Sequence, residues 1–282
     1  MTPFSLNIRG RLVEYDERPA VMGIVNITPD SYFADSRAFA SNDAVRRRVA
    51  TLMEEGADML DIGGYSTRPG AAEVSAAEES DRLERGLRLL RGEAGYDIPV
   101  SVDTFRAEVA RAAVTAWGAD MVNDISGGLL DAGMLALVAE SGVPYILMHM
   151  RGTPQTMTEL CEYPHGVVAD TLAELAERVG AAALEGIADI IVDPGFGFSK
   201  TLGQNWELMR GLELFKTLRR PLLVGVSRKS MLTKALGIPT ENALNATTAL
   251  HALALDRGAD ILRVHDVRAA REAVDVYMQL KS

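Results

Sequence analysis

The chain reads VMGIVNI at residues 21–27, DAVRRRVATLMEE at residues 43–55 and MLDI at residues 59–62. The first and third segments are short and mainly apolar, as buried strands are. The middle segment has apolar residues at helical spacing, and Gly56 follows it as a stop signal. Together they predict one strand–helix–strand unit in which the two strands pair in parallel.

The same alternation of strand-like and helical segments continues to the C-terminus. Strand-like runs begin near residues 21, 58, 98, 120, 143, 188, 221 and 260. Helices are predicted at residues 43–55, 106–117, 131–140, 167–184, 205–218, 230–236, 242–256 and 267–280, with one more after a capping box at residues 75–78. Eight such units in about 260 residues predict an α/β fold, a single (β/α)8 TIM barrel.

The chain shows no internal boundary. No linker rich in Pro, Gly or Ser divides it, so residues 1–282 are predicted to form one domain, with the barrel in residues 21–282. Residues 5–15 flank Gly10 with short strand-like runs and predict an N-terminal β-hairpin, which we expect to plug the bottom of the barrel. An open, doubly wound parallel sheet is the structural alternative.

The composition excludes several classes of protein. Hydrophobic residues make up 48% of the chain and charged residues 24%, which excludes a disordered or collagen-like chain. The net charge of −10 argues against a broad basic surface for nucleic acid. Cys161 is the single cysteine, and residues 1–9 lack a signal-peptide pattern. No run reaches the roughly 20 apolar residues of a membrane span, so we expect a cytoplasmic protein without membrane or nucleic-acid partners.

Polar side chains stand where the predicted strands end. They are, in chain order, Asn26, Asp61, Asp103, Asn123 with Asp124, His149, Asp193, Lys229, and Arg263 with His265. The active sites of TIM barrels lie at this end of the strands. Most of these positions also have a purely structural interpretation: helix caps at Asp103 and Ser227, turns at Asp124 and Asp193, and a core position for His149.

Caps and turns do not explain Arg263, which lies in the apolar run ILRV at residues 261–264. A buried arginine needs partners, and its planar guanidinium suits a phosphate or a carboxylate. The loop GGYSTRPG at residues 63–70 combines backbone N–H groups, hydroxyls and a guanidinium, which is typical of an anion site. By contrast, GFGFSKT at residues 195–201 lacks the glycine that a phosphate loop has before its lysine, here Lys200.

Eight segments resemble, in the same order, the signature motifs of the dihydropteroate synthases, a family of pterin-binding enzymes. The first two are MGIVNITPDS at residues 22–31 and DIGGYSTRPGA at residues 61–71. The others are SVDT at 101–104, VNDI at 122–125, LMHM at 147–150, DPGFGF at 193–198, GVSRKS at 225–230 and LRVHD at 262–266. One such motif is a weak signal, but eight in family order are specific.

The resemblance implies a TIM-barrel enzyme of folate synthesis. Its members condense 6-hydroxymethyl-7,8-dihydropterin diphosphate with 4-aminobenzoate, with Mg²⁺ as cofactor, and release 7,8-dihydropteroate and diphosphate. The resemblance also implies a dissociative (SN1-like) loss of diphosphate, a homodimer and a sulfonamide target. Matched position by position, it assigns Asp103, Asn123, Asp193 and Lys229 to the pterin; Arg263, His265, Thr67 and Arg68 to the diphosphate; Asn26 to Mg²⁺; Tyr32, Pro69, Phe198 and Ser230 to the aminobenzoate; and Met148 to substrate binding.

The implied chemistry matches these residue types. A pterin edge presents N–H donors, which carboxylates and an amide oxygen accept. The reaction needs no protein nucleophile, because stabilising the leaving diphosphate and positioning two partners are enough. A single neutral ligand at Asn26 would hold Mg²⁺ weakly, so we expect the metal to arrive with the diphosphate. We also expect the acidity to lie on outer helices, as at Glu54, Glu55, Glu78 and Glu79, and positive charge to gather at Arg68, Lys229, Arg263 and His265.

Some features leave alternatives open. Residues 32–37 read YFADSR where many family members have Phe-x-Asp-Gly-Gly, so the roles of Asp35 and Arg37 are not assigned. A methyltetrahydrofolate:corrinoid methyltransferase would share the pterin-binding acids, but it would not need the loop at residues 66–70 or the anion pair at Arg263 and His265. A non-catalytic pterin-binding subunit is a third possibility.

Overall fold

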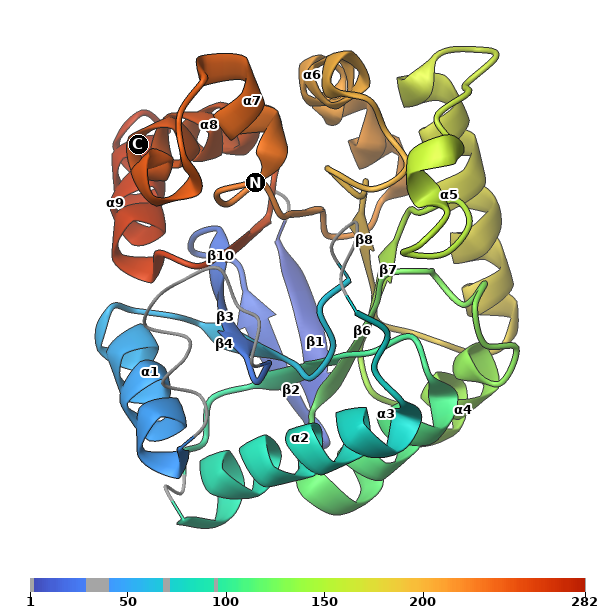
Figure 1. The fold of residues 1–282 in the computed structure, drawn as a ribbon, viewed down its shortest axis with the longest axis vertical. Coiled ribbons are helices and arrows are strands. Elements are labelled where there is room, and N and C mark those ends of the chain that lie inside the picture. The colour runs from blue at the N-terminus through green and yellow to red at the C-terminus, as the bar shows by residue number, and fades with distance from the viewer. Residues whose placement is uncertain (1–2, 29–40, 68–71, 94–95, 282) are drawn as a thin grey trace.

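A computed structural model describes residues 3–28, 41–67, 72–93 and 96–281. Eight parallel strands form its central sheet (Figure 1): β3 (Ala20–Asn26), β4 (Met59–Gly63), β5 (Val100–Asp103), β6 (Met121–Asp124), β7 (Tyr145–Met148), β8 (Ile190–Asp193), β9 (Leu223–Val224) and β10 (Ile261–Val264). β3 to β8 are neighbours in chain order, and β10 lies between β3 and β9. A parallel bridge between Val192 and Leu222 closes the ring from β8 to β9. The barrel prediction is confirmed, and the open doubly wound sheet is excluded.

Helices surround this barrel in Figure 1. They are α1 (Asn42–Glu54), α2 (Ala76–Arg88), α3 (Ala107–Ala112), α4 (Met134–Ser141), α5 (Val167–Leu184), α6 (Leu202–Arg210), α7 (Ser230–Leu236), α8 (Leu244–Asp256) and α9 (Val267–Gln279). π-helical turns follow at Leu89–Glu93 and Ala113–Trp117, and 3-10 turns lie at Met157–Glu159, Leu212–Leu218 and Thr240–Asn242. The predicted bounds of α5 and α7 are confirmed, whereas the segment predicted at residues 205–218 is two elements.

Helix caps explain where the sequence-based boundaries differ. α6 begins at Leu202 because Thr201 and Gln204 form a reciprocal capping box at its start. At α2, Ser75 accepts a hydrogen bond from the backbone N–H of Glu78, as expected for an N-cap. The carboxylate of Glu78 pairs with Arg82 instead of closing the box. The capping box predicted at residues 75–78 is therefore only half formed.

The inside of the barrel contains two layers of side chains. Its lower layer is apolar and consists of Ala20, Met22, Met59, Met121, Ile146, Ile191, Leu223 and Ile261. Successive side chains of a strand alternate between the two faces, so the residue two positions further along also points inward. That step leads from Met59 to Asp61 and from Ile261 to Arg263. The strand alternation therefore aims the polar strand-end residues at the mouth of the barrel, above an apolar floor.

The N-terminal hairpin closes the lower end of the barrel. It consists of β1 (Phe4–Ile8) and β2 (Arg11–Tyr15), which pair antiparallel. Arg9 and Gly10 connect them with φ values of 52° and 75°, as a tight hairpin turn requires. Leu6 and Ile8 are buried and pack on the apolar lower layer. The predicted hairpin and its place beneath the barrel are both confirmed.

Replacing Leu6 with Ala should lower the free energy of unfolding by about 3 kcal/mol, because it leaves a cavity in this packed layer. The rate of any reaction at the opposite end of the barrel should be unchanged. Urea unfolding measures the first quantity. Leu12→Ala is the matched control, since Leu12 lies in the same hairpin but is 67% exposed, and it should cost less than about 0.5 kcal/mol. Equal losses for the two variants would contradict the packing described.

Candidate active site

Arg263 is the centre of a buried cluster at the mouth of the barrel. Its Nε donates to Oδ2 of Asp61 at 2.6 Å, and its Nη2 donates to Oδ2 of Asp103 at 2.8 Å. Asn123 donates from Nδ2 to the same Asp61 oxygen at 3.0 Å. These residues come from β10, β4, β5 and β6, so four strands build one network. The inference that Arg263 needs partners is confirmed, and its partners are two carboxylates.

Asp61 accepts hydrogen bonds from Arg263 and Asn123 and so orients both side chains. Asp61 was assigned no role from the sequence. It is completely buried, and its Oδ1 has no hydrogen-bond partner within the described residues. The amide N–H of Asn123 donates to Asp61, which fixes the orientation of the amide and leaves its carbonyl oxygen as an acceptor. The sequence signal for Asp61 was present, since a carboxylate in the middle of a buried strand requires a partner.

A second group lies beside the first. Asp193 accepts a hydrogen bond from the backbone N–H of Gly195 at 2.8 Å. Lys229 donates to the backbone oxygen of Phe196 at 2.5 Å, and its Nζ lies 4.9 Å from the centre of the Phe198 ring. A Cβ atom at Gly225 would lie 3.8 Å from Nζ of Lys229 and 3.9 Å from both Oδ2 of Asp193 and Cβ of Arg263. The absence of a side chain at Gly225 leaves a space on which these three residues converge.

Burial and mutual attraction set the charges of the site. Burial raises the pKa of Asp103 to about 7, and Arg263 opposes that shift. Burial lowers the pKa of Lys229 to about 8, and Asp193 opposes it. The pKa of Asp193 is raised by burial and held down by Lys229. Burial works against the charge of Arg263, but Asp61 and Asp103 raise its pKa overall. Each charge at the mouth of the barrel is therefore disfavoured by burial and supported by a neighbour of opposite sign.

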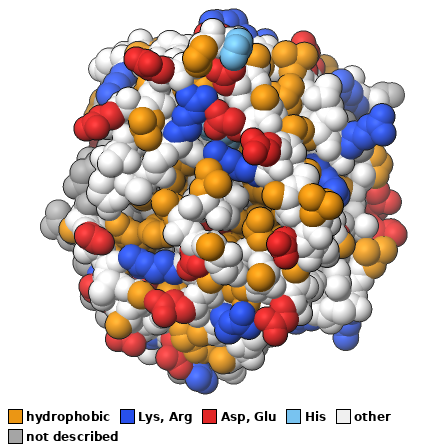
Figure 2. Space-filling view, turned by 90° about the vertical axis from the view of Figure 1, so that its right-hand side faces the viewer, with side chains coloured by type: hydrophobic (Ala, Val, Ile, Leu, Met, Phe, Trp, Pro, Cys, Tyr) orange, Lys and Arg blue, Asp and Glu red, His pale blue; other side chains and the backbone are white. Residues whose placement is uncertain are grey.

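The expected distribution of charge needs two corrections. The mouth of the barrel is not simply positive, because three aspartates surround Arg263 and Lys229. Glu79 is not on a solvated helix face, because it is completely buried and pairs with Arg106. Glu54 and Glu78 are exposed, as expected. On the face shown in Figure 2, acidic and basic side chains are interspersed and neither sign dominates.

Other residues predicted for the site also lie near the ends of the strands. His265 follows β10, and its Nδ1 and backbone N–H both contact Oγ of Ser227, at 3.0 and 3.2 Å. Ser227 therefore does not cap a helix. Thr67 is half-buried beyond β4, and Ser230 is the first residue of α7. Met148 is buried in an apolar cluster against which Phe198 packs. Predictions for Tyr32, Asp35, Arg37, Arg68 and Pro69 lie outside the described residues.

Besides the turn at Asp193, the structural interpretations of Asp124 and His149 are confirmed. Asp124 accepts hydrogen bonds from both the backbone N–H and the hydroxyl of Ser126, and also from the backbone N–H of Gly128 and the hydroxyl of Tyr145. Its carboxylate is fully used in shaping the turn after β6. His149 is completely buried and hydrogen-bonded through both ring nitrogens. Neither side chain has capacity left for a substrate.

A weak cation site is compatible with the end of β3. Oδ1 of Asn26 and Oδ2 of Asp103 each lie 3.7 Å from the point where a Cβ of Gly63 would be. The Asp103 oxygen already accepts from Arg263, whereas the amide oxygen of Asn26 is a hard ligand of the kind that Mg²⁺ prefers. The residues that the structure describes contain no cluster of three or more His, Cys, Asp or Glu side chains suited to a metal. Asn26 fits a metal ion that brings most of its own ligands.

A chain of polar side chains behind the site, from buried Lys200 and His149 to half-buried Glu174 and Arg151, was missed from the sequence. Lys200 is 8% exposed, and its Nζ lies 2.9 Å from Nδ1 of His149. The Nε2 of His149 lies 3.1 Å from Glu174, which also pairs with Arg151. Burial lowers the pKa of His149 to about 3 and that of Lys200 to about 7. His149 is therefore neutral, accepting from Lys200 and donating to Glu174.

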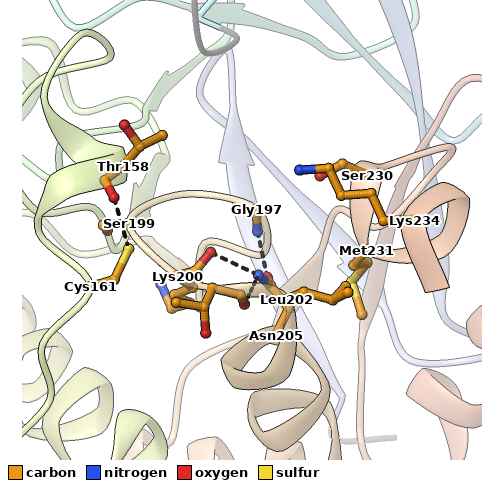
Figure 3. Close-up of a pocket in the computed structure, with 11 residues that line it drawn as sticks. Thr158, Cys161, Gly197, Ser199, Lys200, Leu202, Asn205, Ser230, Met231 and Lys234 are labelled. Atoms are coloured by element: carbon orange, nitrogen blue, oxygen red, sulfur yellow. Dashed lines mark hydrogen bonds between the residues drawn. The ribbon is translucent and has the colours of Figure 1, made fainter.

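A pocket of about 220 Å³ opens on the outer side of the loop after β8 (Figure 3). Its lining comes from the 3-10 turn at Met157–Glu159 and the chain after it, from that loop, and from the starts of α6 and α7. The lining residues are Thr158, Cys161, Gly197, Ser199, Lys200, Thr201, Leu202, Asn205, Ser230, Met231 and Lys234. Of the residues predicted to contact aminobenzoate, Ser230 lines this pocket, whereas Phe198 does not and packs on the cluster around Met148.

The geometry can be compared with known proteins. A family model described as pterin binding enzyme matches residues 22–265, which overlap every strand of the barrel. The chain belongs to the pterin-binding enzyme family. Curated relatives of this pterin-binding enzyme include the dihydropteroate synthase of Synechocystis, which is 44% identical over 97% of this chain and 94% of the relative. The dihydropteroate synthase of Streptococcus pyogenes is 42% identical over 94% and 97%.

Solved structures of the family extend the comparison. Dihydropteroate synthase of Yersinia pestis, in complex with a sulfonamide drug, matches with a TM-score of 0.91 and 37% identity over 99% of each chain. The enzyme of Xanthomonas albilineans with 4-aminobenzoic acid matches with a TM-score of 0.89 and 42% identity, over 100% of this chain and 99% of that one. The same enzyme in complex with 7,8-dihydropteroate gives 0.85 and 39%, over 99% of each.

Proposed function

We propose that this chain condenses 6-hydroxymethyl-7,8-dihydropterin diphosphate with 4-aminobenzoate to give 7,8-dihydropteroate and diphosphate. The observation that carries the proposal is the convergence of Asp103, Asn123, Asp193, Lys229 and Arg263 at one barrel mouth. Membership of the family and relatives named dihydropteroate synthase support it, as do the 4-aminobenzoate and 7,8-dihydropteroate bound to a similar enzyme.

Recognition of the pterin would rest on hydrogen-bond acceptors whose orientation is fixed by other residues of the protein. Asn123 keeps its carbonyl oxygen available because its N–H group is held by Asp61. Asp193 uses Oδ1 on the Gly195 backbone and has Oδ2 toward the space at Gly225. A ring that lacked the matching donors would leave buried carboxylates unpaired, which is costly. Lys229 would serve as the donor to the ring carbonyl.

The chemistry itself would be electrostatic. The C–O bond between the pterin methylene and the diphosphate breaks first, in a dissociative step, and the electron pair leaves with the diphosphate. The aminobenzoate nitrogen then bonds to the methylene carbon, and its surplus proton passes to water. Arg263 and Lys229, with His265, Thr67 and Arg68, would stabilise the developing negative charge. No side chain of the site is required as a nucleophile.

Asn26 would be the protein's ligand for Mg²⁺, with Asp103 beside it. A bound Mg²⁺ would neutralise part of the diphosphate charge, which favours its departure. A single amide oxygen binds such an ion weakly, so the metal should enter as a complex with the diphosphate substrate. The chain contributes the position of the amide at the end of β3.

The dissociative order of steps can be tested with ¹⁸O in the bridge between the methylene carbon and the α-phosphorus. If the C–O bond breaks reversibly before the amine attacks, the label should appear in non-bridging positions of substrate recovered after partial turnover. Label that stays in the bridge would argue for concerted displacement. Any transfer of a methyl group by the chain would instead favour the corrinoid-methyltransferase alternative.

We also propose a homodimer formed through α8 and α9, which lie side by side in Figure 1. These helices and the end of the chain expose large apolar side chains, among them Leu253 at 50%, Val276 at 63% and Leu280 at 80%. Sedimentation velocity should show a dimer that Leu253→Arg converts to a monomer. Leu184→Arg, on α5 across the barrel, is the matched control because Leu184 is 91% exposed. A wild-type monomer at micromolar concentration would contradict this proposal.

We also propose that the protein works in the cytoplasm. None of the helices that the structure describes combines the length and hydropathy needed to cross a bilayer. If Phe198 and Ser230 contact 4-aminobenzoate, as we propose, sulfonamides should compete with 4-aminobenzoate at these residues.

A further inference from the structure

The loop after β8 carries both Phe198 and the backbone oxygen that Lys229 contacts. Gly195, Gly197 and Ser199 in this loop all have positive φ, at 72°, 81° and 46°. Such a backbone is unfavourable for Ser199 and is held only where surrounding contacts over-determine it. The loop is also tight, because a Cβ at Gly195 would lie 1.9 Å from the backbone oxygen of His149.

Lys200 donates hydrogen bonds to two backbone oxygens of this loop. Its ammonium has three N–H donors, and the structure places three acceptors around it: Nδ1 of His149 at 2.9 Å, the oxygen of Phe198 at 3.1 Å and the oxygen of Gly195 at 3.2 Å. The side chain is thus fully used within the fold. Glu174 fixes the His149 ring from the far side, so the acceptor that faces Lys200 is held in place.

Contacts on the outer side complete the arrangement. Asn205 of α6 accepts from the backbone N–H of Gly197 at 2.6 Å and donates to the oxygen of Thr201 at 2.8 Å. The hydroxyl of Tyr163 donates to the oxygen of Ser199 at 2.9 Å. Phe198 itself makes none of these side-chain contacts, and its ring packs on the apolar cluster around Met148. The loop therefore presents Phe198 in a position that the surrounding polar groups determine.

We propose that Lys200 is a positioning residue for the condensation, whose ammonium holds the loop so that Phe198 stands at the junction of the two substrates. This inference rests on the proposed function. Lys200 would act indirectly, through the oxygens of Gly195 and Phe198, because its three N–H donors are all directed at acceptors within the fold. Asp103, Asn123 and Asp193 end the strands β5, β6 and β8, and Asn123 is also held by Asp61, so the pterin contacts depend on this lysine less than the position of Phe198 does.

Loss of Lys200 should therefore affect the binding of 4-aminobenzoate much more than the binding of the pterin. In Lys200→Met, KM for 4-aminobenzoate should rise about tenfold or more, because small displacements of a positioning wall are costly. The dissociation constant of 6-hydroxymethyl-7,8-dihydropterin without diphosphate should stay within about twofold of wild type by calorimetry. A residue that only stabilised the fold would not separate these two constants.

Two further variants make the test decisive. Lys216→Met removes a lysine whose Nζ lies 2.8 and 3.0 Å from the buried Asp260 at the opposite end of the barrel. It should lose stability yet keep both constants. Lys200→Arg retains the positive charge but cannot direct three bonds from one nitrogen, and it covers the case in which Lys200→Met fails to fold. It should show the same division in a milder form.

The same assays separate this inference from the function on which it rests. Wild-type protein that forms no dihydropteroate would overturn both proposals. Wild-type turnover, with an unchanged KM for aminobenzoate in both Lys200 variants, would overturn the role of Lys200 alone. Equal losses of pterin and aminobenzoate binding would overturn it as well.

Discussion

Asp193→Asn should weaken binding of the bare dihydropterin by about 10- to 100-fold, as measured by calorimetry. The asparagine oxygen can still accept from Gly195, so the backbone turn survives. Its amide N–H group, however, replaces the carboxylate oxygen that faces Gly225, so a donor would meet the donors of the pterin. Lys229 would also lose a nearby opposite charge that supports its ammonium.

The control for this variant is Asp256→Asn, the same chemical change at the exposed end of α8. It should leave pterin affinity unchanged. Near-wild-type affinity in Asp193→Asn would remove Asp193 from the pterin site, while equal losses in the two variants would point to a general effect of charge.

Arg263→Met should have the largest effect on stability among the site variants, about 3–5 kcal/mol in the free energy of unfolding at neutral pH. The reason is that Asp61 is completely buried and would lose its cationic partner. Binding of the diphosphate ester should fall much more than binding of the bare pterin, because the guanidinium is also the proposed anion ligand.

A double variant distinguishes these two roles. Arg263→Met combined with Asp61→Asn no longer contains the unpaired charge of Asp61. Burial already raises the pKa of Asp103, the other partner of Arg263, to about 7, so Asp103 can take up a proton. Most of the lost stability should therefore return in urea unfolding. Turnover should stay low, because the guanidinium is still missing. If the double variant were as unstable as Arg263→Met alone, the pairing of Asp61 with Arg263 would not be the source of the effect.

Much of the fold could be predicted from periodicity alone. The apolar strand runs and the 3.6-residue spacing of the helices depend on nearest neighbours in the chain, so they are visible in the sequence. The inward direction of Asp61 and Arg263 also follows from alternation, since each lies two residues after a side chain of the apolar floor. The helix predicted at residues 205–218 is in fact two elements. A capping box starts α6 earlier, at Leu202, and a separate 3-10 turn forms at Leu212–Leu218.

Pairings between distant residues could not be predicted in the same way. The contact of Lys200 with His149 spans 51 positions, and the burial of Glu79 depends on Arg106, which is 27 positions away. Nothing in the local pattern of LMHM or SAAEES specifies such partners. The charge balance at the barrel mouth was misjudged for the same reason, because the sequence does not show that Asp61 and Asp103 pair with Arg263.

The central claim is most directly tested by measuring diphosphate release from purified protein with each combination of pterin diphosphate, 4-aminobenzoate and Mg²⁺. Diphosphate should appear at the same rate as 7,8-dihydropteroate, and only when all three are present; chelation of Mg²⁺ should abolish both signals. Sustained release of diphosphate without 4-aminobenzoate, or no dihydropteroate with all three components, would contradict the account.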